Sequence, residues 1–171
     1  DEILTHVNNI MYPDNMTCQF VTVFCAILNV ETGELQFCNA GHNPPLMCDR
    51  SLCANCPEPI EGCDKSGCFH FMKIPGGFVM GVMQNTLSQH NSIMVHPGET
   101  VFLYTDGVTE AMNERQEQFS EPRLTNLLTE SKDRSVENMI VRIREEVRAF
   151  ANGAPQSDDI TMLAVRYKGA A

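Results

Sequence analysis

Carboxylates that stand where an apolar run meets a loop are the first candidates for chemistry. Asp106 follows the run "VFLYT", and Asp158 and Asp159 precede "ITMLAV". If both runs are strands that meet at one rim of a sheet, their carboxylates make the oxygen-rich site that Mg²⁺ or Mn²⁺ prefers. Neighbouring side chains on an extended backbone point to opposite faces, so only one of Asp158 and Asp159 should face such a site. Each pattern alone is equally typical of a turn, and this alternative stays open.

A cysteine cluster is the second group of candidate ligands. Five of the eight cysteines follow the pattern C-x4-C-x2-C-x6-C-x4-C: Cys48, Cys53, Cys56, Cys63 and Cys68. Four thiolates could hold a structural zinc ion. The fifth cysteine would then remain without a metal, and the two-plus-two cysteine spacing of a zinc ribbon is absent. Reduced or partly oxidised thiols are the alternative. Cys18, Cys25 and Cys38 lie in apolar runs and are expected to be buried.

Length and charge exclude several classes of protein. A chain of 171 residues with 43% hydrophobic residues fits one domain, 1–171, with a real core. The net charge of −10 argues against nucleic acid or an anionic membrane as partner, since both reward clustered Lys and Arg. No apolar run approaches the roughly 20 residues needed to span a bilayer, so we expect no direct membrane insertion.

The order of the expected elements indicates an α+β fold. Residues 1–11 have helical spacing, 17–30 form a long, well-buried strand, and 35–40 complete a hairpin with it. Strands are also expected at 69–74, 92–96, 101–105 and 160–167, and residues 48–68 form a polar loop. Two helices precede the last strand. The second begins after Ser135 and carries an apolar stripe of Val136, Met139, Ile140, Ile143, Val147 and Phe150. Hairpins dominate, which favours antiparallel sheets with helices packed outside them.

Three motifs occur in sensible order: "FVTVFCAILNVETGELQFCNAGHNPPLM", "PGETVFLYTDGVTEAMN" and "QSDDITMLAVRY". Together they resemble the bacterial metal-dependent protein serine/threonine phosphatases of the PPM (phosphatase 2C-like) superfamily, of the RsbU/SpoIIE type. The resemblance covers residues 1 to about 167, and the cysteine-rich stretch 48–68 is an insertion in it. It implies an antiparallel β-sandwich flanked by helices (αββα).

The resemblance also implies a two-metal Mn²⁺ or Mg²⁺ site. Asp106 matches the aspartate of the "TDG" motif, and Asp158 matches the first aspartate of the "DD-I-T" motif, so both are expected to be catalytic metal ligands. Gly107 and Asp159 are expected to lie behind these ligands and support them. His42 of "GHNPP" is expected to serve a tight turn rather than catalysis.

One expected motif has no counterpart. The family carries an acidic "GDYYD"-type motif before the first helix, and none occurs in residues 1–171. The resemblance therefore implies that the N-terminal part of the domain is missing. We expect weak or absent activity from this chain alone and incomplete metal binding.

Partners follow from the same resemblance. The expected substrate is a phosphorylated protein, a STAS-type anti-anti-sigma factor, and the expected location is the cytoplasm, behind an upstream sensor or receiver domain or as the output domain of a membrane-bound sensor. The alternative is a catalytically inactive binding module with a zinc-stabilised or thiol-rich docking loop.

Overall fold

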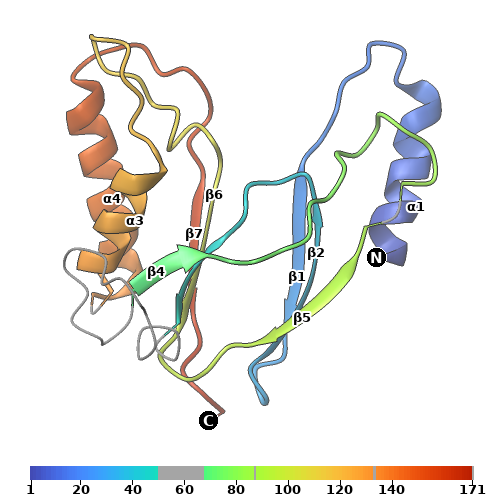
Figure 1. Cartoon of the computed structure of the whole chain (residues 1–171), viewed down its shortest axis with the longest axis horizontal. Coiled ribbons are helices and arrows are strands. Elements are labelled where there is room, and N and C mark those ends of the chain that lie inside the picture. The colour runs from blue at the N-terminus through green and yellow to red at the C-terminus, as the bar shows by residue number, and fades with distance from the viewer. Residues whose placement is uncertain (50–67, 87, 133, 171) are drawn as a thin grey trace. The chain divides into compact units, whose positions relative to one another are not determined.

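The computed structural model describes residues 1–49, 68–86, 88–132 and 134–170, and it divides into two compact units. The first unit comprises Asp1–Pro44, Lys73–His96 and Gly169–Ala171, and the second comprises Pro45–Met72 and Pro97–Lys168. Figure 1 labels the elements of both. All strand pairs within the two sheets are antiparallel, as the sequence predicts.

The first unit contains helix α1 (Glu2–Met11), a short 3-10 helix η1 (Tyr12–Asp14) and a sheet in the order β1-β2-β5. Its strands are β1 (Val23–Leu28), β2 (Glu34–Ala40) and β5 (His90–Met94). Leu4 of α1 packs with Cys38 and Ala40 of β2 in a small core.

Helix α1 forms where the sequence predicts it but buries less of its apolar stripe. Its Asp1 cap accepts a hydrogen bond from the Glu2 amide at 2.7 Å. Ile3 and Ile10 remain 70% and 60% exposed, whereas the polar Asn8 is buried. Asn8 is satisfied there, because its amide accepts from the Gly81 N–H and donates to the Met83 carbonyl.

Three expectations for the strands and cysteines were wrong. The strand expected at 17–30 is restricted to β1, whose residues are half-buried or exposed because β1 is an edge strand. Cys18 and Cys25 are exposed, and of that group only Cys38 is buried. Sequence reasoning also missed a strand, β3 (Leu46–Asp49), which the prediction placed partly in the cysteine-rich loop.

The second unit carries the larger core. Its sheet has the order β4-β3-β6-β7, with β4 (Cys68–Phe71), β6 (Thr100–Tyr104) and β7 (Met162–Arg166) joining β3. Helices α3 (Glu121–Glu130) and α4 (Val136–Ala151) lie side by side against this sheet (Figure 1). The fully buried members of this core come from strands, helices and the loop after β6: Leu46, Phe69, Phe102, Val108, Leu124, Leu128, Met139 and Ile143.

Helix α4 confirms its predicted cap and stripe. The Ser135 side chain accepts from the Asn138 amide, and Met139, Ile143 and Val147 are buried. The helix ends at Ala151 and is capped by Asn152, which adopts the left-handed conformation at φ 47° before the loop that leads to β7. Within the described residues, no helix is long and apolar enough to cross a membrane.

The core of the second unit gives the first test. Ile143→Ala removes a fully buried side chain, so we expect the free energy of unfolding to fall by about 2–5 kcal/mol. Val141→Ala lies on the same helix at 40% exposure and should change it by no more than about 0.5 kcal/mol. Urea denaturation measures both, and equal losses would contradict this core assignment.

Candidate functional site

The pairing of β6 with β7 brings the two acidic motifs together. The register ends at Tyr104 opposite Met162, and one step further the Thr105 N–H donates to the Thr161 carbonyl at 3.0 Å. The Thr105 hydroxyl adds two bonds: it accepts from the Thr161 N–H at 2.9 Å and donates to the Asp159 carbonyl at 2.7 Å. These hydrogen bonds therefore hold the segment after β6 against the segment before β7.

Gly107 makes the contact between these segments a close one. A Cβ at this position would lie 2.5 Å from the Asp159 carbonyl oxygen and 3.0 Å from that of Asp158. Both distances fall well inside normal contact with a main chain that cannot rotate away. Glycine is thus required at this position for space.

Asp106 is a turn residue whose carboxylate stays outside the turn. Its main-chain carbonyl accepts from the Glu110 N–H at 2.8 Å and from the Thr109 hydroxyl at 3.2 Å. The residue is exposed, and no hydrogen bond reaches its carboxylate from any part of the chain that the structure describes. The two interpretations of the sequence are therefore compatible, because the turn uses the backbone and leaves the side chain available.

Asp158 and Asp159 differ in their contacts. The Asp158 carboxylate accepts from the Asp159 N–H at 2.6 Å, and its carbonyl accepts from the Gln156 amide at 2.8 Å. Asp159 contributes its carbonyl to the Thr105 hydroxyl. Both residues are exposed. A carboxylate held by its own neighbouring amide has a fixed direction, whereas Asp159 takes part through its main chain.

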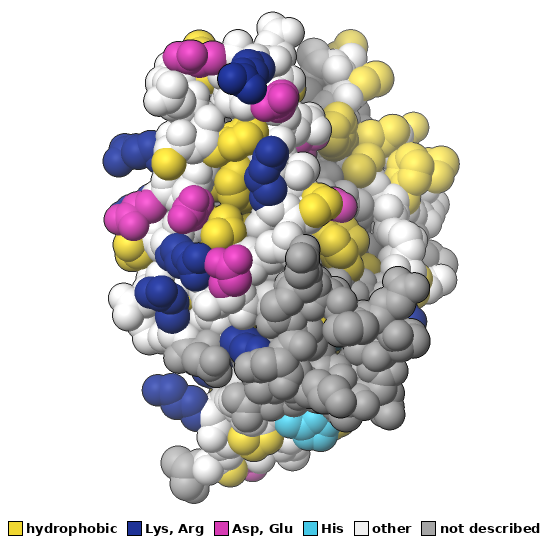
Figure 2. All heavy atoms as spheres, turned by 60° about the vertical axis from the view of Figure 1, so that its left-hand side comes forward, with side chains coloured by type: hydrophobic (Ala, Val, Ile, Leu, Met, Phe, Trp, Pro, Cys, Tyr) yellow, Lys and Arg dark blue, Asp and Glu magenta, His cyan; other side chains and the backbone are white. Residues whose placement is uncertain are grey.

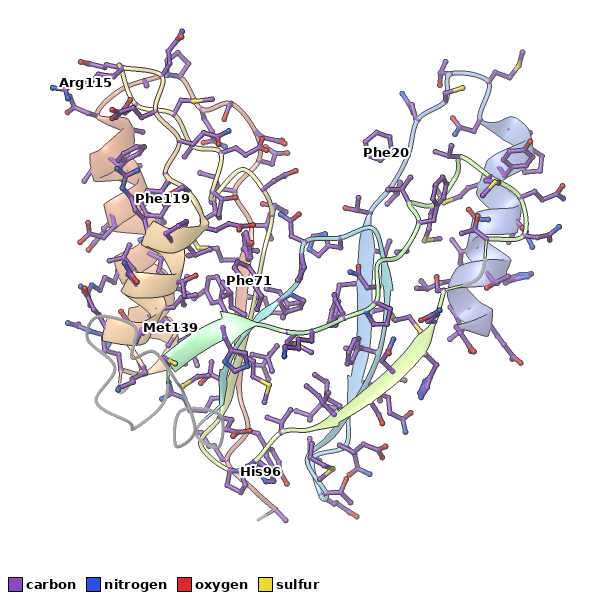
Figure 3. The ribbon with its side chains drawn as sticks, in the orientation of Figure 1. Phe20, Phe71, His96, Arg115, Phe119 and Met139 are labelled. Atoms are coloured by element: carbon purple, nitrogen blue, oxygen red, sulfur yellow. The ribbon has the colours of Figure 1, made fainter. Side chains whose placement is uncertain are left out.

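The loop from β6 to α3 is itself anchored, which fixes the position of Asp106. Within it, the Phe119 N–H donates to the Ala111 carbonyl and the Ser120 N–H to the Thr109 carbonyl, both at 2.8 Å. The Phe119 ring packs edge-on against Phe150 of α4 with centroids 5.5 Å apart. Figure 3 shows Phe119 on the helical side and Arg115 at the outer end of this loop.

The donor set is suited to a hard cation but is small. Asp106 and Asp158 offer carboxylate oxygens on adjoining segments, and such oxygens are the ligands of Mg²⁺ and Mn²⁺. Among the residues that the structure describes, no group of three or more His, Cys, Asp or Glu side chains is placed to hold a metal. The described residues therefore offer two carboxylates, and no third donor of these types groups with them.

The surroundings of Tyr104 raise the pKa of its phenol. It is only 3% exposed, and burial, followed by the negative charges of Glu121 and Asp106, raises its pKa from 10.0 to about 12. Its phenol is therefore neutral at physiological pH.

The cysteine cluster does not form one site from its described members. Cys48 lies opposite Phe69 and Cys68 lies opposite Asp49, so the two thiols belong to opposite faces of the β3–β4 pair. Both cysteines are buried, Cys48 within the large core. One zinc ion cannot take both as ligands. Cys53, Cys56 and Cys63 lie outside the described residues.

His42 occupies the turn that the sequence predicts. The Asn39 side chain accepts from the His42 N–H and donates to the His42 carbonyl, both at 2.9 Å, and the His42 ring nitrogen Nδ1 lies 3.2 Å from the Thr22 hydroxyl. These bonds explain why "NAGHNPP" needs an asparagine, and they give the motif a structural role.

Thr105 is the residue that sequence reasoning missed. The signal was its position between an apolar strand and Asp106. A threonine hydroxyl there can accept the hydrogen bond that a backbone carbonyl would otherwise accept from the neighbouring strand. Ser157 was missed as well: its hydroxyl donates to the Glu110 carbonyl at 3.4 Å and links the same two loops.

Comparisons of the sequence identify the relatives of this chain. A sequence model of the family "Stage II sporulation protein E (SpoIIE)" matches residues 1–168. Protein IcfG of Synechocystis is 33% identical over 146 residues, 85% of this chain and 20% of that protein. Phosphoserine phosphatase RsbU of Bacillus subtilis is 23% identical over 168 residues, 98% of this chain and 45% of that protein.

A solved structure shows the fold. The SiaA-PP2C domain of Pseudomonas aeruginosa matches with a TM-score of 0.74 at 18% identity, covering 96% of this chain and 58% of that one. The predicted α+β, phosphatase 2C-like fold is thereby confirmed. The chain spans less than half the length of the two curated relatives that it matches.

The close approach at Gly107 is testable. Gly107→Ala should lower the free energy of unfolding by roughly 1–3 kcal/mol, because the added methyl group must displace the backbone at Asp159. Gly76→Ala is the matched control, since a Cβ there meets nothing within 4 Å. Urea denaturation of both variants decides, and a Gly107→Ala variant as stable as the control would refute the contact.

The raised pKa of Tyr104 predicts how stability depends on pH. Between pH 10 and 12 the unfolded chain releases a phenolic proton that the folded chain retains, so the free energy of unfolding falls as pH rises through this window. The stabilising contribution is fully present below pH 10. Tyr104→Phe should show a shallower fall in urea denaturation across the window, and identical slopes would contradict the prediction.

Proposed function

This chain belongs to the stage II sporulation protein E (SpoIIE) family, and we propose that it takes part in metal-dependent dephosphorylation of phosphoserine or phosphothreonine on a protein. RsbU of Bacillus subtilis, one of its relatives, is named a phosphoserine phosphatase. One observation carries the proposal: the segments that bear Asp106 and Asp158 are in direct contact across the β6–β7 pair.

Each residue of this site has a definite task. Asp106 and Asp158 would hold Mn²⁺ or Mg²⁺ through their carboxylates. A cation bound there would lower the pKa of water and would neutralise charge on the phosphoryl group. Thr105 holds the two loops together, and Gly107 allows them to approach. Asp159 supports the site through its carbonyl.

The proposed partners follow the family. The substrate would be a phosphorylated anti-anti-sigma factor of the STAS type, and the chain would act in the cytoplasm as the output of an upstream sensor or receiver domain. The negative net charge of −10 is consistent with a protein rather than a nucleic acid as partner.

A second function is favoured by the small donor set. Two carboxylates without a third donor among the described residues suit a module that binds a phosphoprotein without hydrolysing it. The two functions differ in turnover.

Turnover and metal binding together test the proposal. We expect slow, Mn²⁺-dependent release of phosphate from a phosphoserine protein, and Mn²⁺ binding detectable by calorimetry. Loss of a residue that merely supports a metal ligand costs about 10–100-fold, so Asp106→Asn should cost at least this much in both readouts. Asp14→Asn, at an exposed aspartate of the first unit, is the control.

The outcomes separate the two functions. Mn²⁺ binding without turnover would assign the binding module. Turnover that is unchanged in Asp106→Asn would overturn the assignment of the site.

A further inference from the structure

A hollow in the second unit lies beside the candidate site and is not used by it. Its volume is about 460 Å³, and one wall is the stripe Arg144, Val147, Arg148 and Ala151 of α4. The loop Gly153–Ser157, which leads directly to Asp158, lines it as well. Ala111, Met112, Ile160 and Met162 complete an apolar lining.

The helix places both arginines on one side. Positions i, i+3, i+4 and i+7 share a face of an α-helix, so Arg144 and Arg148 flank the buried Val147 at the hollow. Glu145 and Glu146 follow at steps of about 100° and project away from that face. The hollow therefore combines an apolar floor with two guanidinium groups.

These two arginines differ from three other arginines of the unit, whose guanidinium groups are engaged. Arg142 pairs with Glu130, Arg166 donates to the carbonyls of Lys132 and Arg134, and Arg123 lies over the Phe150 ring. No hydrogen bond or ion pair reaches the guanidinium groups of Arg144 and Arg148 from the described residues. The net charge of the chain is −10, yet these two positively charged side chains can attract a negatively charged group locally.

A second depression borders this hollow. Its lining is Met112, Asn113, Glu114, Gln116, Gly153, Ala154 and Pro155, so Met112 and the Gly153–Pro155 segment belong to both. Figure 2 shows the face of the molecule toward α3 and α4, where hydrophobic side chains are exposed among charged ones.

We propose that this hollow is a docking site for an acidic segment of the protein substrate, one that carries an apolar side chain beside its carboxylates. The arginines would bind the carboxylates, and the floor around Val147 and Ile160 would take the apolar side chain. Because the loop that lines the hollow continues into Asp158, a segment bound in the hollow lies next to the phosphorylated residue of the substrate. That the bound segment belongs to a phosphatase substrate rests on the proposed function. That the hollow binds an acidic segment does not.

Peptide binding tests the site without any turnover. A fluorescein-labelled, unphosphorylated peptide of Glu, Asp and Leu should bind the chain, and its Gln, Asn and Leu counterpart should bind more weakly. The double variant Arg144→Gln/Arg148→Gln should lose about tenfold or more in affinity for the acidic peptide, because each charge-assisted bond is worth on the order of a tenfold change. Fluorescence polarisation measures these affinities.

Lys168→Gln is the control, since it removes one positive charge at a position beyond the end of β7 and outside the lining of the hollow. It should leave peptide binding unchanged. Equal affinity for the two peptides, or equal losses in the control and the double variant, would overturn the docking site.

A kinetic readout separates failure of docking from failure of the proposed function. With phosphoserine versions of the two peptides, the ratio of kcat/KM for the acidic over the neutral peptide should fall in the double variant. Turnover with an unchanged ratio would refute docking and keep the phosphatase. Peptide binding that depends on the arginines, without turnover of either phosphopeptide, would keep docking and refute the phosphatase.

Discussion

The contact between the end of β6 and the start of β7 is the constraint on which the site depends. Carboxylates repel one another, so two acidic loops do not approach without some other force holding them. Here that force is backbone pairing, extended beyond the last paired residues by the Thr105 hydroxyl. The missing side chain at Gly107 lets the main chains come within contact distance.

The larger core supports this contact from behind. Val108 follows the acidic turn directly and is fully buried, and Phe119 closes the same loop against α4. The loop that carries Asp106 is thus fixed at both ends by apolar packing, while its carboxylate remains exposed. Rigid support with an accessible charged group is the general requirement for a metal ligand.

Much of the fold could be predicted from sequence, because it depends on local patterns. The stripe and the Ser135 cap of α4, the hairpin of β1 with β2 and the closing strand were all readable from spacing. Strand β3 was missed because four residues after two prolines carry almost no periodicity. The burial of 17–30 was overestimated because composition cannot tell an edge strand from a central one.

For the site, the sequence by itself determined which residue types stand at the strand ends: Asp106 beside a glycine, and Asp158 before an apolar run. Only the tertiary structure decided which segments meet. It set Thr105 against Asp159, put Cys48 and Cys68 on opposite faces, and turned the arginine stripe of α4 toward the loop before Asp158. The reason is physical: periodicity is a property of neighbours along the chain, whereas register and packing arise between residues far apart in it.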